Sequence, residues 1–281
     1  MDTIIKPKIS IRDGSFAHGV GLGCGDFNWP PSFFDYDRTD AWQKVCLFTD
    51  GEIVKNTVLN SKSEINIAWI LEPYSLIPRV YHFLSDRKNS DKYDHILTHC
   101  QELIETNPNK YRYYPFGGCW IQPENRIVHP KTKNISIIAS GKSTTYGHKL
   151  RHEVIANFKD QIDVFGRGYN VIDLKEEALK NYRYSIVIEN DSNNYWFTEK
   201  LIDCLVTGTI PIYFGSNISK IFDMEGIITF STIKELAEIL PKLTEEIYLK
   251  KLPMVQKNLI KALEYACPED WIFSNFLKGI L

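Results

Sequence analysis

The C-terminal half of the chain alternates short apolar runs with longer segments whose apolar positions recur at helical spacing. The apolar runs predict buried strands at residues 135–140, 162–165, 184–189 and 210–214. The segments between them predict helices at residues 147–159, 174–182 and 197–207. Strands that alternate with helices are typical of a parallel sheet built from βαβ units. The tail, residues 231–281, is mostly helical in pattern.

The N-terminal half repeats this alternation less regularly. Strands are predicted at residues 65–71, 93–98 and 111–115, and helical segments at residues 74–89 and 99–107. Residues 1–65 cluster glycine, proline and aromatic residues, so we expect them to be irregular. A polar, proline-bearing stretch at residues 122–134 has the character of a linker. We therefore predict an α/β fold with two Rossmann-like domains, residues 1–130 and residues 131–281.

Composition narrows the class of protein without naming a function. Hydrophobic residues make up 43% and charged residues 24% of the 281 residues, as in ordinary globular proteins. The formal charge of −2 gives no global attraction to nucleic acid or to an anionic membrane. The first residues lack the apolar core of a signal peptide, and no apolar run is long enough to span a membrane. We expect a cytoplasmic protein, or one in the host-cell cytoplasm if it is viral.

The most informative chemistry lies at residues 184–215, where a buried strand leads through a polar turn into a helix. The turn carries Glu189 and Asn190, and the helix opens with Thr198, Glu199 and Lys200. Thr198 is a suitable N-cap, and a helix N-terminus attracts anions such as phosphate. A lysine in the first turn opposes the helix dipole, which indicates a bound anion. Glu199 can accept hydrogen bonds from ribose or sugar hydroxyls.

This segment resembles the donor-binding motif of the α-1,3-fucosyltransferases. The matching letters are IENDS at residues 188–192, FTEKL at 197–201 and TGTIPIYFG at 207–215. Two upstream segments are also similar to the family, IDVFGRG at 162–168 and the helix HKLRHEVIANF at 148–158. The sequence departs from the family at Trp196, where the family has a tyrosine that helps to hold the nucleotide sugar, and by one inserted residue before Ser192.

The resemblance implies a GT-B fold, in which two Rossmann-like domains face a central cleft, and an inverting sugar transfer. It implies that Arg151, Lys200 and the helix N-terminus bind the diphosphate, with Glu199, Trp196, Thr198 and Asn190 around the donor. Gly166 and Arg167, in the FGRG turn, are further donor-binding candidates. Glu72 matches the family's proposed base, and Glu189 is expected to face the sugar ring. The donor implied is a nucleotide sugar, with GDP-fucose favoured, and the acceptor an oligosaccharide or glycan, so that protein glycosylation is one expected role.

No obligatory metal or cofactor is expected, because two fixed cations can replace a metal. His148 and His152 are neighbours on the predicted helix, but no third ligand is evident, so we expect solvated histidines there. Two alternatives stay open. One is the same fold with another donor, such as UDP-xylose or UDP-galactose. The other is a non-catalytic module that binds a glycan or a nucleotide.

Overall fold

The computed structural model describes residues 6–13, 30–192 and 195–281. It divides the chain into two compact units, each built around its own parallel sheet. Unit 1 comprises residues 1–116, 194–196 and 267–281, and unit 2 comprises residues 117–193 and 197–266.

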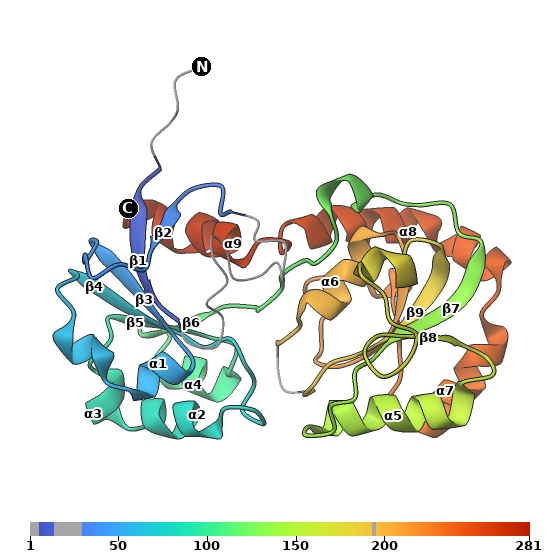
Figure 1. Cartoon of the computed structure of the whole chain (residues 1–281), viewed down its shortest axis with the longest axis horizontal. Helices are drawn as coiled ribbons and strands as arrows, with labels where there is room; N and C mark the ends of the chain where they lie inside the picture. The colour runs from blue at the N-terminus through green and yellow to red at the C-terminus, as the bar shows by residue number, and fades with distance from the viewer. Residues whose placement is uncertain (1–5, 14–29, 193–194) are drawn as a thin grey trace, which may run out of the picture. The chain divides into compact units, whose positions relative to one another are not determined.

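Unit 1 contains a six-stranded parallel sheet in the order β2-β1-β3-β4-β5-β6. Its strands are β1 (Lys8–Arg12), β2 (Asp35–Asp37), β3 (Val45–Thr49), β4 (Ile65–Trp69), β5 (His95–Thr98) and β6 (Tyr111–Tyr113). Its helices are α1 (Gly51–Val54), α2 (Pro78–Ser85), α3 (Arg87–Ser90), α4 (Gln101–Thr106) and α9 (Pro268–Asn275), with 3-10 turns η2 (Thr57–Asn60) and η7 (Leu277–Gly279). Figure 1 shows α1 to α4 on one side of this sheet and α9 on the other.

The two faces of this sheet carry separate apolar cores. One core joins the strands to α2 through Val80 and Leu84. The other joins them to α9 through Ile272 and Trp271. The last fifteen or so residues therefore complete unit 1, although we had predicted one C-terminal domain over residues 131–281. Sequence reasoning could not place α9, because its partners lie far away along the chain.

The predicted irregularity of residues 1–65 is wrong for the described residues of that segment. Three of the six strands lie there, and every residue of β3 is buried. A buried strand of five residues has apolar side chains on both faces and shows no alternation. The loop-rich sequence around it therefore concealed it.

Unit 2 contains a five-stranded parallel sheet in the order β11-β10-β9-β7-β8. Its strands are β7 (Lys133–Ile138), β8 (Asp163–Phe165), β9 (Tyr182–Ile188), β10 (Ile210–Phe214) and β11 (Ile228–Thr229). Its helices are α5 (Tyr146–Phe158), α6 (Glu199–Val206), α7 (Ile233–Ile239) and α8 (Glu245–Leu263), with 3-10 turns η3 (Pro123–Asn125), η4 (Lys175–Ala178), η5 (Met224–Gly226) and η6 (Leu240–Lys242). The helix predicted at residues 174–182 is only η4.

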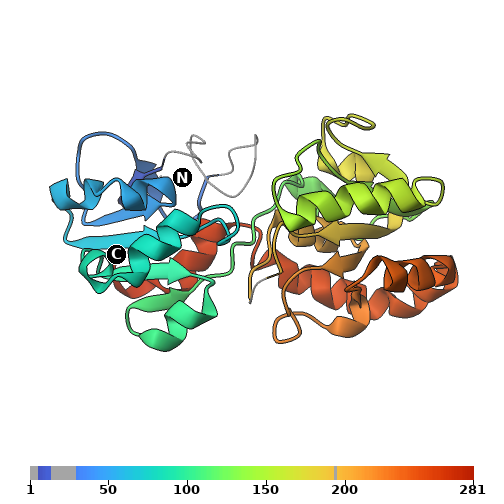
Figure 2. The same ribbon diagram turned by 90° about the horizontal axis from the view of Figure 1, so that it is seen from below.

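The faces of the unit 2 sheet are covered by different helices. Leu150, Val154 and Phe158 of α5 pack on the apolar side chains of β7, β9 and β10. In Figure 1, α6 and α8 lie on the opposite side of the sheet from α5. Figure 2, seen from below, shows α5 lying across its sheet. This arrangement brings the N-termini of α5 and α6 to the C-terminal ends of the strands, where open α/β sheets bind ligands.

No helix in the described part of the chain is long and apolar enough to cross a membrane.

Candidate active site

The turn after β9 is the centre of the site in unit 2. Glu189 follows the strand directly, and its side chain is completely buried. Its two carboxylate oxygens accept hydrogen bonds from the backbone N–H of Thr198, at 2.8 Å, and from the Thr198 hydroxyl, at 2.7 Å. Thr198 is the N-cap of α6. Glu189 therefore fastens the start of α6 to the end of β9.

Two glycines leave room for the buried Glu189. A Cβ atom on Gly147 would lie 1.8 Å from the carbonyl oxygen of Glu189, so α5 approaches the turn as closely as only glycine allows. A Cβ atom on Gly215 would lie 2.3 Å from the Tyr213 hydroxyl and 3.0 Å from Cγ of Glu189. Burial raises the pKa of Glu189, and the nearby Lys200 ammonium opposes part of that rise.

The first turn of α6 carries a compact group of charges. Nζ of Lys200 lies 3.1 Å from Oε1 of Glu199 and 3.8 Å from Oε2 of Glu189. The Lys200 side chain is 27% exposed, so its ammonium can still reach a ligand. Burial raises the pKa of Glu199, but the ammonium groups of Lys200 and Lys175 outweigh this effect and hold the pKa at about 2. Glu199 is therefore a carboxylate at any physiological pH.

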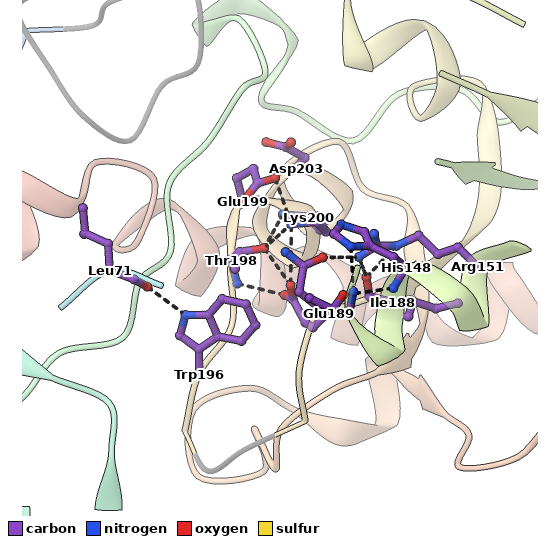
Figure 3. Close-up of polar contacts among 12 residues, drawn as sticks. Leu71, His148, Arg151, Ile188, Glu189, Trp196, Thr198, Glu199, Lys200 and Asp203 are labelled. Carbon is purple, nitrogen blue, oxygen red and sulfur yellow. Dashed lines mark hydrogen bonds and ion pairs between the residues drawn. The ribbon is translucent and has the colours of Figure 1, made fainter. Parts of the chain in front are cut away.

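Arg151 approaches the same turn from α5. Its Nε donates to the carbonyl oxygen of Ile188 at 3.0 Å, and one terminal nitrogen donates to that carbonyl and to Oδ1 of Asn190, the latter at 3.0 Å. The second terminal nitrogen makes no hydrogen bond to a described residue. Burial lowers the pKa of Arg151, and Glu189 and Glu199 counteract this effect. Figure 3 shows Arg151 and Lys200 reaching the turn from different helices.

The structure corrects the expectation of a solvated histidine for His148, whereas His152 is half-buried. His148 is buried and exchanges hydrogen bonds with the α5 N-cap Thr145 in a capping box. Burial and the charge of Arg151 lower its pKa to about 4, so its ring is neutral. His152 is bonded through Nδ1 to the Tyr169 hydroxyl at 2.7 Å. Both rings fix the loop before α5. No group of three or more His, Cys, Asp or Glu side chains in the described ranges could hold a metal ion.

A buried ion-pair network behind α6 was missing from the sequence prediction. Nζ of Lys175 lies 2.8 Å from Oδ2 of Asp203 and 3.4 Å from Oε1 of Glu199, above the ring of Trp120 at 4.2 Å. The other oxygen of Asp203 accepts the backbone N–H of Trp120 at 2.6 Å. Glu199 is thus held between two lysines. A lysine on a surface turn carries no signal of such a role in the sequence.

Two predicted donor-binding residues, Gly166 and Arg167, directly follow β8. Gly166 has φ of +110°, and a Cβ atom there would lie 2.0 Å from the carbonyl oxygen of Ala139, just after β7. Only glycine fits this close crossing. Arg167 is exposed, and no described residue pairs with it.

Glu72 and Trp196 belong to unit 1. Glu72 follows β4, and its backbone carbonyl accepts a hydrogen bond from the Tyr81 hydroxyl at 3.0 Å. The Trp196 side chain is 1% exposed, and its indole N–H donates to the carbonyl oxygen of Leu71 at 3.2 Å (Figure 3). The predicted contact of Trp196 with a donor stays a prediction, and its burial argues against it.

The unit 2 residues combine in one place two cations, the backbone N–H groups of a helix N-terminus and an ionised carboxylate. Such a set can bind a diphosphate through charge-assisted hydrogen bonds and can accept hydrogen bonds from neighbouring hydroxyls. It can also stabilise negative charge that develops on a phosphate leaving group.

Comparison with known proteins points to one family. Residues 128–251 match the model of glycosyltransferase family 10 (fucosyltransferase), C-terminal part. The alpha-(1,3)-fucosyltransferase FucT of Helicobacter pylori is 35% identical over 218 residues, which cover 75% of this chain and 39% of that protein. A putative fucosyltransferase-like protein of Arabidopsis thaliana is 30% identical over 150 residues, covering 51% of this chain and 28% of the relative. The chain thus spans about two fifths or less of the length of these relatives.

A crystal structure of an alpha1,3-fucosyltransferase with GDP has a similar fold. It superimposes with a TM-score of 0.56 at 16% sequence identity, covering 94% of this chain and 90% of that one. The matches confirm the predicted resemblance, the α/β fold with parallel sheets, and its GT-B type.

Proposed function

We propose that this chain, which carries a glycosyltransferase family 10 (fucosyltransferase) C-terminal domain at residues 128–251, is an inverting glycosyltransferase that moves fucose from GDP-fucose to a glycan hydroxyl. The observation that carries the proposal is that two cationic side chains from different helices contact the same turn after β9. Arg151 is bonded to Ile188 and Asn190, and Lys200 lies beside Glu189 between them.

In this proposal Lys200, Arg151 and the N-terminus of α6 bind the diphosphate of the donor. The exposed ammonium of Lys200 and the terminal nitrogen of Arg151 that bonds to no described residue supply the hydrogen-bond donors. The attraction between these cations and the diphosphate grows as negative charge moves onto the leaving group. Protein contacts already fix both cations in position, so they need no rearrangement during the reaction. Since these two charges can neutralise the leaving group, we propose that transfer needs no metal ion.

The remaining predicted residues surround the donor. Glu199 is ionised and accepts hydrogen bonds from hydroxyls of the nucleotide or the sugar. Thr198 and Asn190 shape the site through the turn, and Arg167 is an exposed cation near the base or phosphate, with Gly166 allowing the strand ends to approach. Glu189 acts as a positioning residue, because both of its oxygens are bound to Thr198. In this proposal it holds the turn in place and does not face the sugar ring.

The proposed reaction is a single displacement. The acceptor hydroxyl attacks the anomeric carbon while the bond from that carbon to the diphosphate oxygen breaks. The hydroxyl proton passes to Glu72 acting as general base, and the configuration at the anomeric carbon inverts. Glu72 is supported by its place shortly after β4, which ends at Trp69, and by the resemblance.

The test is a transfer assay with a donor panel of GDP-fucose, UDP-galactose and UDP-xylose and an oligosaccharide panel. Release of nucleoside diphosphate and mass spectrometry of the acceptors report the reaction, with and without EDTA. We expect fucosylated product from GDP-fucose only, unchanged by EDTA. Product from a UDP-sugar would replace the donor assignment, and the absence of product from every donor would contradict the enzyme assignment.

A further inference from the structure

The backbone around Glu72 is held by side chains from three separate parts of unit 1. Oδ1 of Asp50 accepts the N–H of Leu71 at 2.8 Å. The indole N–H of Trp196 donates to the carbonyl oxygen of Leu71 at 3.2 Å, as Figure 3 shows. The Tyr81 hydroxyl donates to the carbonyl oxygen of Glu72 at 3.0 Å. The segment after β4 is outside the sheet ladder, so these bonds replace the missing strand contacts.

Tyr81 is itself oriented by a buried histidine. The Tyr81 hydroxyl lies 2.8 Å from Nε2 of His99, whose side chain is buried at 3% exposure. Burial lowers the pKa of His99 to about 3, so its ring is neutral. The Tyr81 hydroxyl can donate to the Glu72 carbonyl and bond to His99 at the same time only when the proton of His99 lies on Nε2. That choice leaves Nδ1 as an acceptor, and Nδ1 has no hydrogen-bond donor among the described residues.

Asp50 has an unfavourable backbone conformation and a buried carboxylate that is only partly hydrogen-bonded. Its φ is +35° with ψ of −105°, a combination that few residues other than glycine adopt. It is 2% exposed, and its Oδ2 has no hydrogen-bond partner in the described part of the chain. Burial raises its pKa to about 7, with the N–H of Leu71 opposing the rise and the charge of Glu72 adding to it. Strain and an unsatisfied buried oxygen at one residue are typical of functional sites.

We infer that Asp50, Tyr81 and Trp196 are positioning residues, which fix the backbone of Glu72 so that its carboxylate meets the acceptor hydroxyl. This inference rests on the proposed function, in which Glu72 is the base. It also gives Trp196 a role that its burial allows. A carboxylate that must take a proton in the transition state loses rate steeply when its position varies, and a displacement of 1 Å can cost about 10²-fold.

The test compares two tyrosines that make the same kind of bond. The Tyr93 hydroxyl donates to the carbonyl oxygen of Ile53 at 3.0 Å, also in unit 1 and also from a buried side chain. Tyr81→Phe and Tyr93→Phe each remove a hydroxyl-to-carbonyl bond and keep the ring, and Tyr81→Phe also removes the contact with His99. We expect Tyr81→Phe to lower kcat between about 5- and 100-fold without changing KM for GDP-fucose. Tyr93→Phe should keep kcat within about twofold, although it too removes a buried hydrogen bond and lowers the melting temperature.

Two more variants make the result specific. Trp196→Phe keeps an aromatic ring but removes the N–H donor, and it should lower kcat in the same way. Asp50→Asn keeps an oxygen that can accept the Leu71 N–H, and asparagine tolerates positive φ, so it should retain more activity than Asp50→Ala. Equal kcat for Tyr81→Phe and Tyr93→Phe, or equal activity for the two Asp50 variants, would overturn the inference.

Glu72→Gln separates this inference from the proposed function. If Glu72→Gln loses its activity while Tyr81→Phe keeps a normal kcat, the positioning role is wrong and the base assignment stands. If Glu72→Gln is as active as the unmodified chain, Glu72 is not the base, and if the unmodified chain transfers no sugar, there is no reaction that needs a base. Either result overturns the positioning role together with the proposed role of Glu72.

Discussion

Replacing Lys175 by methionine should leave two buried carboxylates without their common partner. The Lys175 ammonium lies 2.8 Å from Asp203, whose side chain is 1% exposed, and 3.4 Å from Glu199, whose side chain is 13% exposed. Removing one member of a buried ion pair typically costs about 3–5 kcal/mol, because the remaining charge stays buried. We expect a loss of free energy of unfolding of that size.

The pH dependence of this loss has a definite sign. Burial raises the pKa of Asp203, and Lys175 is the main group that lowers it. Without Lys175, the folded-state pKa of Asp203 rises further above its unfolded value of about 3.9. A group with a raised folded-state pKa favours the folded state at low pH, and this contribution is lost as the pH rises through that pKa. The loss in Lys175→Met should therefore be larger at pH 8 than at pH 5.

Urea unfolding at both pH values measures the effect. Lys234→Met is the matched control, because Lys234 is exposed on α7 and no described ion pair involves it, so its change should stay within about 0.5 kcal/mol. The double variant Lys175→Met with Asp203→Asn should recover part of the loss, since asparagine carries no charge and can still accept the Trp120 N–H. A loss below about 1 kcal/mol that is the same at both pH values would refute the reasoning.

Three further predictions follow from single contacts. Glu72→Gln should lower kcat by about 10²-fold or more, as expected for the loss of a general base, and should leave the affinity for GDP, measured by calorimetry, within about twofold. A normal kcat would mean that another residue is the base. Gly147→Ala should lower the free energy of unfolding by about 1–3 kcal/mol, because its methyl group would lie 1.8 Å from the Glu189 carbonyl; an unchanged urea midpoint would contradict that close approach. Thr198→Val should cost about 1–2 kcal/mol in the same assay, since it removes the cap of α6 and the hydroxyl that donates to Glu189; a neutral result would mean that the cap contributes nothing.

The parts of the site that sequence reasoning placed correctly in the chain are local. The strand ending before Glu189, the N-cap Thr198 and the helix opening with Lys200 are contiguous, so their patterns can be read without knowing the fold. The roles of these residues toward a ligand stay predictions.

The missed parts depend on partners that are distant along the chain. Asp50 bonds to Leu71 across 21 residues, and Lys175 bonds to Asp203 across 28 residues. Nothing around either residue indicates these contacts, and β3, which ends directly before Asp50, was itself concealed in a loop-rich stretch. For Glu189 the sequence predicted the position in the turn after the strand. It did not predict that the side chain is completely buried against Thr198.

The proposed function depends most on the binding of the donor diphosphate at the N-terminus of α6 in unit 2. The most direct test is calorimetric titration of GDP into the unmodified chain, Lys200→Met and the control Lys234→Met. A charge-assisted hydrogen bond contributes about 1.5–3 kcal/mol, which corresponds to roughly 10- to 150-fold in Kd. We predict that Lys200→Met weakens GDP binding by that factor and that Lys234→Met leaves it unchanged. Equal GDP affinity for Lys200→Met and the unmodified chain would contradict the account.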